Sequence, residues 1–143
     1  MLQESEVLHI GQKAWEAFSR GWASGVWEEY KLMLSPDMEF SFPVGPFRGK
    51  YNGKEGYEKM IAKIESDSKT GYRLLFTVKH ISSNDNTVVV EYEAVGNFDG
   101  YPYRSNNAIA FSLHDGMISA YREYFGDLDF DMFDHFTKLA ANQ

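Results

Sequence analysis

The sequence has no cysteine among its 143 residues, so disulfide bonds, thiolate nucleophiles and cysteine metal ligands are excluded. It also lacks any apolar run of about 18 residues, the length that a helix needs to cross a bilayer. The first residues, MLQESEVLHIGQ, have neither the basic start nor the apolar stretch of a signal peptide. We therefore expect a cytoplasmic protein without a membrane partner.

Positive charge is also scarce. The net charge of −7 argues against a nucleic-acid partner or an anionic membrane surface. The charge is uneven, because residues 48–79 hold eight Lys or Arg and four Asp or Glu, and the remaining residues therefore sum to −11. A helix face in solvent explains this basic stretch, and contact with an anion is the alternative.

Aromatic residues, in contrast, make up 16% of the chain, enough for a large core or an aromatic-lined cavity. Apolar residues at helical spacing predict a helix over 5–22 and a shorter one over 26–34. A third helix is expected to begin at Asn52, whose side chain would form a capping box with Glu55. An acidic start predicts a last helix within residues 127–141.

The other segments alternate between apolar and polar residues and predict strands. One strand contains Met38, Phe40 and Phe42 and stops at the sequence PVGP. The turns between the later strands are short, which forces antiparallel neighbours. These later strands are expected over 72–82, 87–98, 101–114 and 117–126. The order of elements indicates one α+β domain over residues 1–143, with helices on one face of a curved sheet.

Three segments, FSFPVGPFRG, NGKEGYEKMI and DGMISAYREYFGD, resemble the SnoaL-like branch of the nuclear transport factor 2-like superfamily. That superfamily includes ketosteroid isomerases, polyketide cyclases, limonene epoxide hydrolases, scytalone dehydratases and members that only bind. The resemblance implies a cone-shaped, curved antiparallel β-sheet around the N-terminal helices, of the cystatin-like type, with an extra C-terminal helix. It also implies a deep apolar pocket for a small apolar molecule and, by analogy, a homodimer through the outer sheet face.

The sequence departs from the isomerase pattern at three positions. The catalytic carboxylate of that pattern corresponds to Phe42, its hydrogen-bonding tyrosine to Phe18, and its second acid to Ile109. Proton abstraction next to a carbonyl needs a base and a group that stabilises the oxyanion, and these side chains supply neither. Ketosteroid isomerisation by that set of residues is therefore not expected.

Strand alternation predicts which side chains face the pocket. A two-residue loop at Asp99-Gly100 would pair Val90 with Ile109 and Tyr92 with Asn107. This apolar face should be the inner one. Its members are Val88, Val90, Tyr92, Ala94, Asn107, Ile109, Phe111 and Leu113. The opposite face, with Glu91, Glu93, Arg104 and Asn106, should meet solvent or a partner subunit.

The last strand has two possible registers. A two-residue Asp115-Gly116 loop would turn Arg122 and Tyr124 inward, whereas a three-residue loop that includes His114 would turn Tyr121 and Glu123 inward. We favour the second, because Gly116 then occupies the left-handed position of the loop.

In the favoured register, Glu123 lies opposite Asn107 and beside Tyr121. Desolvation would raise the pKa of its carboxyl, which makes Glu123 the candidate acid/base and Tyr121 its catalytic neighbour. A structural glutamate that bonds to Asn107 or to a tyrosine is the alternative.

The remaining candidates are ligand-binding side chains. Trp15, Phe18 and Trp22 form one stripe of the first helix, and we expect them to line the pocket with Phe42, Tyr92, Asn107 and Ile109. His80 alternates with inward residues of its strand and is a further candidate for chemistry. No pair of His, Asp or Glu has metal-ligand spacing on a common face, so neither a metal nor a cofactor is expected.

Three hypotheses follow: an acid–base enzyme of the isomerase, cyclase, dehydratase or hydrolase type, a binding module without chemistry, and a dimeric interaction protein.

Overall fold

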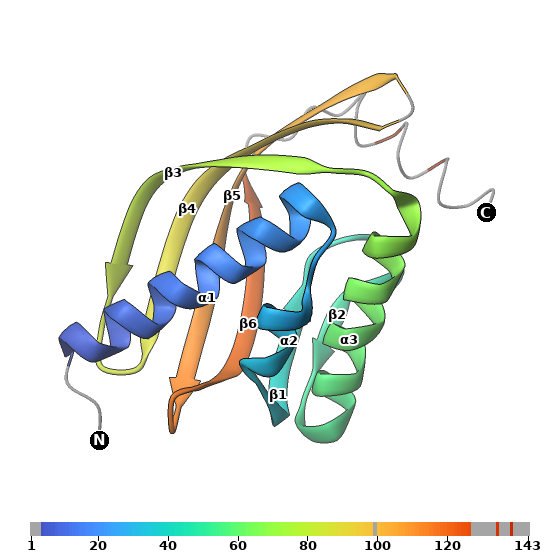
Figure 1. Cartoon of the computed structure of the whole chain (residues 1–143). Coiled ribbons are helices and arrows are strands. Elements are labelled where there is room, and N and C mark those ends of the chain that lie inside the picture. Colours follow the sequence, from blue (N-terminus) through green and yellow to red (C-terminus); the bar gives the residue numbers. More distant parts are fainter. Residues whose placement is uncertain (1–3, 99, 127–133, 135–137, 139–143) are drawn as a thin grey trace.

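The fold is α+β, with helices first and a six-stranded sheet after them (Figure 1). The computed structural model describes residues 4–98, 100–126, 134 and 138, so the helix predicted within 127–141 lies almost wholly outside the described residues. The elements are α1 (Glu4–Ser24), α2 (Glu28–Leu32), β1 (Leu34–Phe42), β2 (Gly49–Tyr51), α3 (Gly53–Thr70), β3 (Leu74–Ser83), β4 (Thr87–Phe98), β5 (Tyr101–His114) and β6 (Met117–Gly126).

The sheet is curved and open, with the strand order β2-β1-β6-β5-β4-β3. The long strands bend around α1, and α3 lies at the other end of the sheet, over β1 and β2 (Figure 1). Neighbouring strands are antiparallel except for β1 and β6, which run parallel. The predicted curved antiparallel sheet is thus confirmed as mostly antiparallel, and a long crossover connects its parallel pair, β1 and β6.

The PVGP segment connects two paired strands. Residues Gly45–Phe47 form a short 3-10 turn, and β2 then returns antiparallel to β1, with Phe42 opposite Gly49. The short strand β2 was not predicted, because its three residues show too little alternation. Asn52 does precede α3, but its side chain makes no capping hydrogen bond, so the predicted capping box is wrong.

A glycine sets the distance between α3 and the sheet. A Cβ atom on Gly56 would lie 1.9 Å from the backbone oxygen of Met38 and 2.9 Å from that of Tyr51. The helix backbone therefore rests directly on β1 at this point, which any larger residue would prevent. This contact fixes the positions of the α3 side chains that follow it, including those near the functional site.

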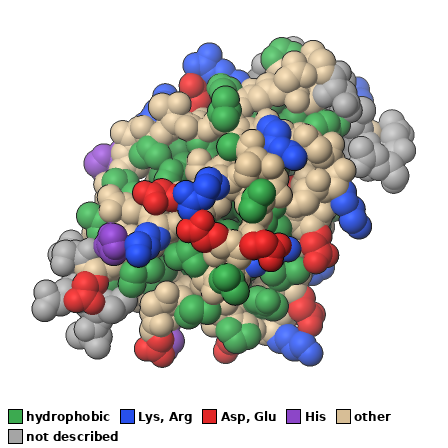
Figure 2. Space-filling view, viewed as in Figure 1, with side chains coloured by type: hydrophobic (Ala, Val, Ile, Leu, Met, Phe, Trp, Pro, Cys, Tyr) green, Lys and Arg blue, Asp and Glu red, His purple; other side chains and the backbone are tan. Residues whose placement is uncertain are grey.

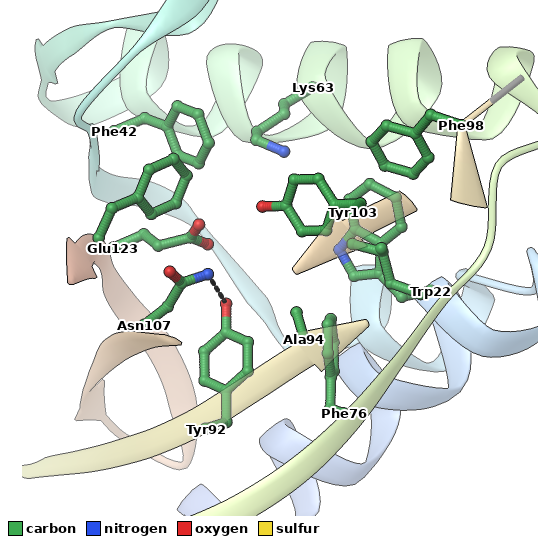
Figure 3. A pocket seen from close by; sticks show the side chains of 12 residues that line it. Trp22, Phe42, Lys63, Phe76, Tyr92, Ala94, Phe98, Tyr103, Asn107 and Glu123 are labelled. Atoms are coloured by element: carbon green, nitrogen blue, oxygen red, sulfur yellow. Dashed lines mark hydrogen bonds between the residues drawn. The ribbon is translucent and has the colours of Figure 1, made fainter. Parts of the chain in front are cut away.

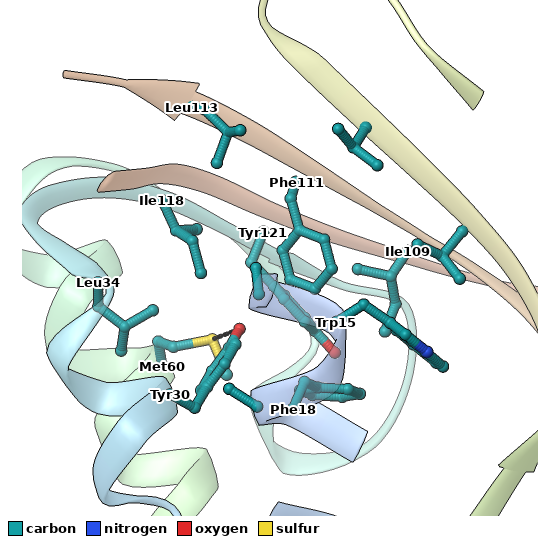
Figure 4. Close-up of a cluster of buried hydrophobic side chains, with 14 of the residues drawn as sticks. Trp15, Phe18, Tyr30, Leu34, Met60, Ile109, Phe111, Leu113, Ile118 and Tyr121 are labelled. Atoms are coloured by element: carbon teal, nitrogen blue, oxygen red, sulfur yellow. Dashed lines mark hydrogen bonds between the residues drawn. The ribbon is translucent and has the colours of Figure 1, made fainter. Parts of the chain in front are cut away.

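The core lies between α1, α2, α3 and the inner face of the sheet (Figure 4). Phe18 of α1 is at its centre, with its ring 5.4 Å from that of Tyr30 and 5.9 Å from that of Tyr121. The hydroxyl group of Tyr30 donates a weak hydrogen bond to Sδ of Met60, 3.9 Å away. Aromatic side chains thus fill most of the space that a deeper cone would leave open.

The surface is mixed in charge. On the face in Figure 2, acidic and basic side chains are interspersed with apolar ones. Arg20 of α1 and Glu29 of α2 form an ion pair that joins these two helices. Among the described residues, none of the helices combines the length and the hydropathy needed to span a membrane.

Candidate functional site

The pairing of β4 with β5 follows the predicted register. Val90 lies opposite Ile109, Tyr92 opposite Asn107 and Phe98 opposite Tyr101. The predicted inner-face residues of both strands are all buried. The sequence prediction for this hairpin is therefore confirmed, and it places Tyr92 and Asn107 side by side on the inner face.

A bulge on β6 decides which of its side chains face inward. The turn has two residues, Asp115 and Gly116, both with positive φ, and pairs His114 with Met117. Ser119 is then an extra residue on β6, since Leu113 pairs with Ile118 and Ser112 with Ala120. A β-bulge of this kind reverses the alternation beyond it.

Because of this bulge, Tyr121, Glu123 and Phe125 share the inner side of the sheet. The predicted inward orientation of Tyr121 and Glu123 is therefore confirmed, but the predicted three-residue loop is wrong, because the bulge produces this orientation. The predicted partner of Glu123 was also wrong: Glu123 lies opposite Ile109, and Phe125 lies opposite Asn107. Arg122 faces outward, where its guanidinium donates hydrogen bonds to Glu39 and Ser112.

A cavity of about 120 Å³ lies between α1, α3 and the inner face of the sheet (Figure 3). Its wall is mostly aromatic, with a few polar groups that point inward. The lining residues are Trp22, Phe42, Lys63, Leu74, Phe76, Tyr92, Ala94, Phe98, Tyr103, Asn107, Glu123 and Phe125. An apolar wall with few convergent polar groups is the usual form of a small-molecule site.

Glu123 is the acidic residue of this cavity, and its side chain is only 8% exposed. Burial raises the pKa of its carboxyl from 4.5 to about 7, because desolvation disfavours the charged form. The positive charge of Lys63 and a hydrogen bond from the hydroxyl of Tyr121 lower this pKa, and Asp67 raises it slightly. A carboxyl of this pKa both accepts and releases a proton near neutral pH.

Lys63 supplies the cation of the cavity. Its Nζ atom lies 2.7 Å from Oδ2 of Asp67, 4.6 Å from the centre of the Phe42 ring and 5.5 Å from that of the Trp22 ring. The ion pair and the two aromatic faces offset part of the cost of burying an ammonium group. The cavity thus combines a titratable carboxyl with an ammonium group.

Asn107 links the polar side chains of the sheet. Its Nδ2 donates to the hydroxyl of Tyr92 at 3.3 Å and to Oγ of Ser105 at 3.1 Å, and Ser105 donates to the hydroxyl of Tyr103 at 3.0 Å. Its Oδ1 is buried without a hydrogen-bond partner among the described residues. Buried polar atoms are normally paired, so this oxygen is an exception in the polar network of the sheet.

The neighbouring tyrosines stay protonated at neutral pH. Burial raises the pKa of Tyr103 to about 12, partly opposed by the hydrogen bond from Ser105. Burial, and then the negative charge of Glu123, raise the pKa of Tyr92 and Tyr121 well above the usual value. These phenols therefore act as hydrogen-bonding groups, and Glu123 is the group that titrates near pH 7.

The structure divides the predicted site residues into two groups. Trp22, Phe42, Tyr92, Asn107 and Glu123 line the cavity. The others lie in the hydrophobic core and are not among its lining residues: Trp15, Phe18, Ile109 and Tyr121. Tyr121 still reaches the site through its hydrogen bond to Glu123.

The inward orientation suggested for His80 is wrong. A register shift between Val78 and His80 puts an extra residue, Lys79, into β3 and breaks the alternation. The side chain of His80 is exposed as a result. Within the described part of the chain, no three His, Asp or Glu side chains are grouped closely enough to hold a metal ion.

Several lining residues were missed in the sequence, and Lys63 is the most important. The basic stretch over residues 48–79 predicts a solvated helix face for Lys63. The helical stripe of Gly56, Met60, Lys63 and Asp67, at spacings of four and three, would have placed it inward. Strand alternation also places three aromatic side chains on the inner face of the sheet, and it could have identified them as lining residues: Phe76, Phe98 and Tyr103.

The sequence matches the family model of the SnoaL-like domain over residues 15–121. The chain belongs to the SnoaL-like family. Among proteins of curated function, none matches this SnoaL-like domain.

Solved structures share its fold. An NTF2-like protein from Anabaena variabilis is 32% identical, with 90% of this chain and 96% of that one covered and a TM-score of 0.79. A candidate polyketide cyclase from Xanthomonas campestris pv. campestris is 19% identical, with 91% and 95% covered and a TM-score of 0.69. A candidate ketosteroid isomerase from Kribbella flavida is 13% identical, with 88% and 82% covered and a TM-score of 0.62.

Proposed function

We propose that this SnoaL-like domain is an acid–base enzyme that acts on a small, mostly apolar organic molecule, with Glu123 as the group that takes up and releases the proton. The observation that carries the proposal is a buried carboxyl on the wall of an aromatic cavity, with a pKa of about 7. Perturbed carboxyls in clefts are typical of catalytic sites. Solved relatives named as candidate cyclases and isomerases are consistent with this chemistry.

The state of the polar groups favours an enzyme over a passive binding module. A binder would be expected to have its cavity polar groups fully bonded to one another. Here Glu123 makes its one hydrogen bond within the described chain through Oε1, with Tyr121. The other oxygen of this carboxyl can receive a donor from the substrate, while the carboxyl exchanges a proton.

The proposed catalytic residues differ from those of the ketosteroid isomerase pattern. The three positions that carry polar groups in that pattern are occupied by Phe18, Phe42 and Ile109, and two of them lie outside the cavity. The base is instead supplied by the last strand, opposite Ile109. The reaction type is thus set by Glu123 and its neighbours.

The experiment has two stages. A thermal-shift screen of small hydrophobic carbonyl and hydroxyl compounds identifies ligands of the wild-type protein. Proton–deuterium exchange or turnover of these ligands is then followed by NMR with the wild type, Glu123→Gln and Glu93→Gln. We expect the reaction to be lost in Glu123→Gln and kept in Glu93→Gln, whose carboxylate pairs with Arg104 on the opposite sheet face. Equal rates for all three proteins would refute the assignment.

We also propose that the protein is a cytoplasmic homodimer that pairs through the outer sheet face. The outer sheet face carries a shallow groove of about 460 Å³, and Tyr124, 54% exposed, is one of its lining residues. If this face forms the dimer, Tyr124→Lys should shift the sedimentation coefficient toward that of a monomer. An unchanged coefficient would place any dimer interface elsewhere.

A further inference from the structure

The strongest unexplained feature of the cavity is the direction of Lys63. Lysine is among the residues least often buried, yet Lys63 is only 8% exposed and its ammonium group points into the cavity (Figure 3). Burying a charge costs free energy even when it is paired. The fold keeps this cation in an aromatic wall, where an apolar side chain would pack at lower cost.

The ion pair with Asp67 does not require this inward position. The same helix carries a second pair at the same spacing, Lys54 and Glu58, with Nζ 3.8 Å from Oε1 and both side chains exposed. A lysine four residues before an acid can therefore be accommodated in solvent on α3. The ion pair alone therefore does not explain why the Lys63 ammonium group lies in the cavity wall.

The pair presents its positive end to the cavity. Lys63 is a lining residue, whereas Asp67 is not among the residues that line the cavity. The effect of Lys63 on the Glu123 carboxyl is also larger than the opposite effect of Asp67. A negative charge that forms in the cavity would thus meet an attractive field in a water-poor environment.

The size of the cavity limits what can carry this charge. Its volume of about 120 Å³ is below the ~300–1,000 Å³ of sites for drug-sized ligands. It is closer to the ~150 Å³ engineered cavity that holds benzene in another protein. A molecule, or part of a molecule, of about one ring fits this space.

We propose that Lys63 is an anion-binding residue, and that the cavity takes a molecule of about one ring that carries or develops negative charge on an oxygen atom. This inference rests on the proposed acid–base function and names its substrate class: small enolisable carbonyl compounds and their enolate or carboxylate analogues. The ammonium group donates one of its three N–H groups to Asp67. The others have no hydrogen-bond acceptor among the described residues, and they can bind an oxygen of the ligand.

The proton transfer needs no reactant besides the substrate and Glu123. The Glu123 carboxylate takes a proton from the carbon next to the carbonyl, and the electron pair of that C–H bond becomes a C=C bond. The carbonyl π pair moves to the oxygen, which accepts a hydrogen bond from Nζ of Lys63. Return of this proton to another carbon gives isomerisation. If the carboxyl first exchanges its proton with solvent, return to the same carbon gives proton–deuterium exchange.

The test uses benzoate and benzamide, two one-ring compounds that differ in charge, by isothermal titration calorimetry at pH 6 and low salt. We expect the wild type to bind benzoate about ten-fold more tightly, because a charge-assisted hydrogen bond is stronger than a neutral one. Lys63→Met should lose this preference and Lys63→Arg should keep it. Equal affinities in the wild type, binding of neither compound, or an unchanged preference in Lys63→Met would overturn the proposal.

Lys59→Met is the matched control. Lys59 lies one turn earlier on α3, and its Nζ is 4.8 Å from the centre of the Tyr51 ring, but it does not line the cavity. This variant removes the same charge and a cation–π contact and should keep the benzoate preference. The comparison of benzoate with benzamide on the wild type needs no variant. The proposal can therefore be refuted even if Lys63→Met does not fold.

Glu123→Gln separates this inference from the proposed function. If both hold, this variant loses proton–deuterium exchange and keeps the preference for benzoate. If the wild type prefers benzoate to benzamide but catalyses no proton–deuterium exchange of the screened ligands, only the proposed function is refuted. If it catalyses this exchange but has no preference for benzoate, only the anion site is refuted.

Discussion

The hydroxyl group of Tyr121 donates a hydrogen bond to Oε1 of Glu123, two residues further along the same face of β6. Tyr121 is fully buried in the core, and Glu123 lines the cavity, so this bond connects the rigid interior to the reactive group. It favours the charged carboxylate and opposes the effect of burial. Burial raises the pKa of Glu123, and the positive charge of Lys63 and then the Tyr121 hydrogen bond lower it, which leaves the pKa at about 7.

Removing this bond should raise the pKa of Glu123 further. In Tyr121→Phe, the carboxylate loses a donor but stays buried, and we expect its titration midpoint to rise by about one pH unit. Carbon-13 NMR of labelled glutamate side chains measures the change. Tyr30→Phe is the control, because the hydroxyl of Tyr30 bonds to Met60 and not to Glu123. A lower or unchanged midpoint in Tyr121→Phe would contradict the assigned role of the bond.

The raised pKa also makes the stability of the protein depend on pH. Between pH 4.5 and about 7, the folded protein holds a proton on Glu123 that the unfolded chain has released. Stability is therefore lost as the pH rises through this window, by on the order of 2–3 kcal/mol between pH 5 and pH 8.

Glu123→Gln should remove this loss, because an amide does not titrate. Urea unfolding at pH 5 and pH 8 compares the two proteins, and the variant should be the more stable one at pH 8. Glu93→Gln is the control, since hydrogen bonding from Arg104 lowers the pKa of Glu93 and moves its effect below this window. The same pH dependence in wild type and Glu123→Gln would be evidence against a buried, titrating Glu123.

Gly56→Ala should destabilise the fold, since the added methyl group would overlap the backbone oxygen of Met38. We expect the free energy of unfolding to fall by about 1–3 kcal/mol, as for other overpacked contacts. Ser66→Ala, at an exposed position of α3, should leave stability unchanged or slightly increased. Thermal unfolding followed by circular dichroism measures both, and equal melting temperatures would argue against the close contact of α3 with β1.

Ala94→Leu should block ligand binding while the sheet remains intact. Ala94 is buried and lines the cavity, so three extra carbon atoms would occupy space that a one-ring molecule needs. Val95→Leu adds one carbon at the next position, on the opposite face, and serves as the control. A ligand found in the thermal-shift screen should stabilise Val95→Leu but not Ala94→Leu. Equal stabilisation of both would move the binding site elsewhere.

Most of the fold could be predicted from local patterns. The β4–β5 hairpin shows why: a two-residue turn with Gly100 fixes the pairing of two long alternating strands, so that Tyr92 meets Asn107. The β5–β6 hairpin shows the limit. Turn chemistry alone does not reveal an extra residue such as Ser119, and one residue reverses the orientation of Glu123.

The candidate site was predicted in part, because its members depend on contacts between distant elements. Trp15 and Trp22 lie on the same face of α1, seven residues apart. Trp22 lines the cavity, whereas Trp15 does not, and its ring packs 4.7 Å from that of Tyr92. Their difference follows from where α1 crosses the sheet. Lys63 was missed because its charge suggested solvent, although the close packing at Gly56 turns that helix face inward.

A pH titration of the Glu123 carboxyl carbon, followed by NMR, tests whether this carboxyl is buried and exchanges its proton near neutral pH. The resonance is assigned as the one that disappears in Glu123→Gln, with all other glutamates retained. We expect a midpoint near pH 7, well above 4.5, because the carboxyl is buried in the cavity. A midpoint near 4.5 would show a carboxyl in water, and would contradict both the cavity geometry and the proposed acid–base role.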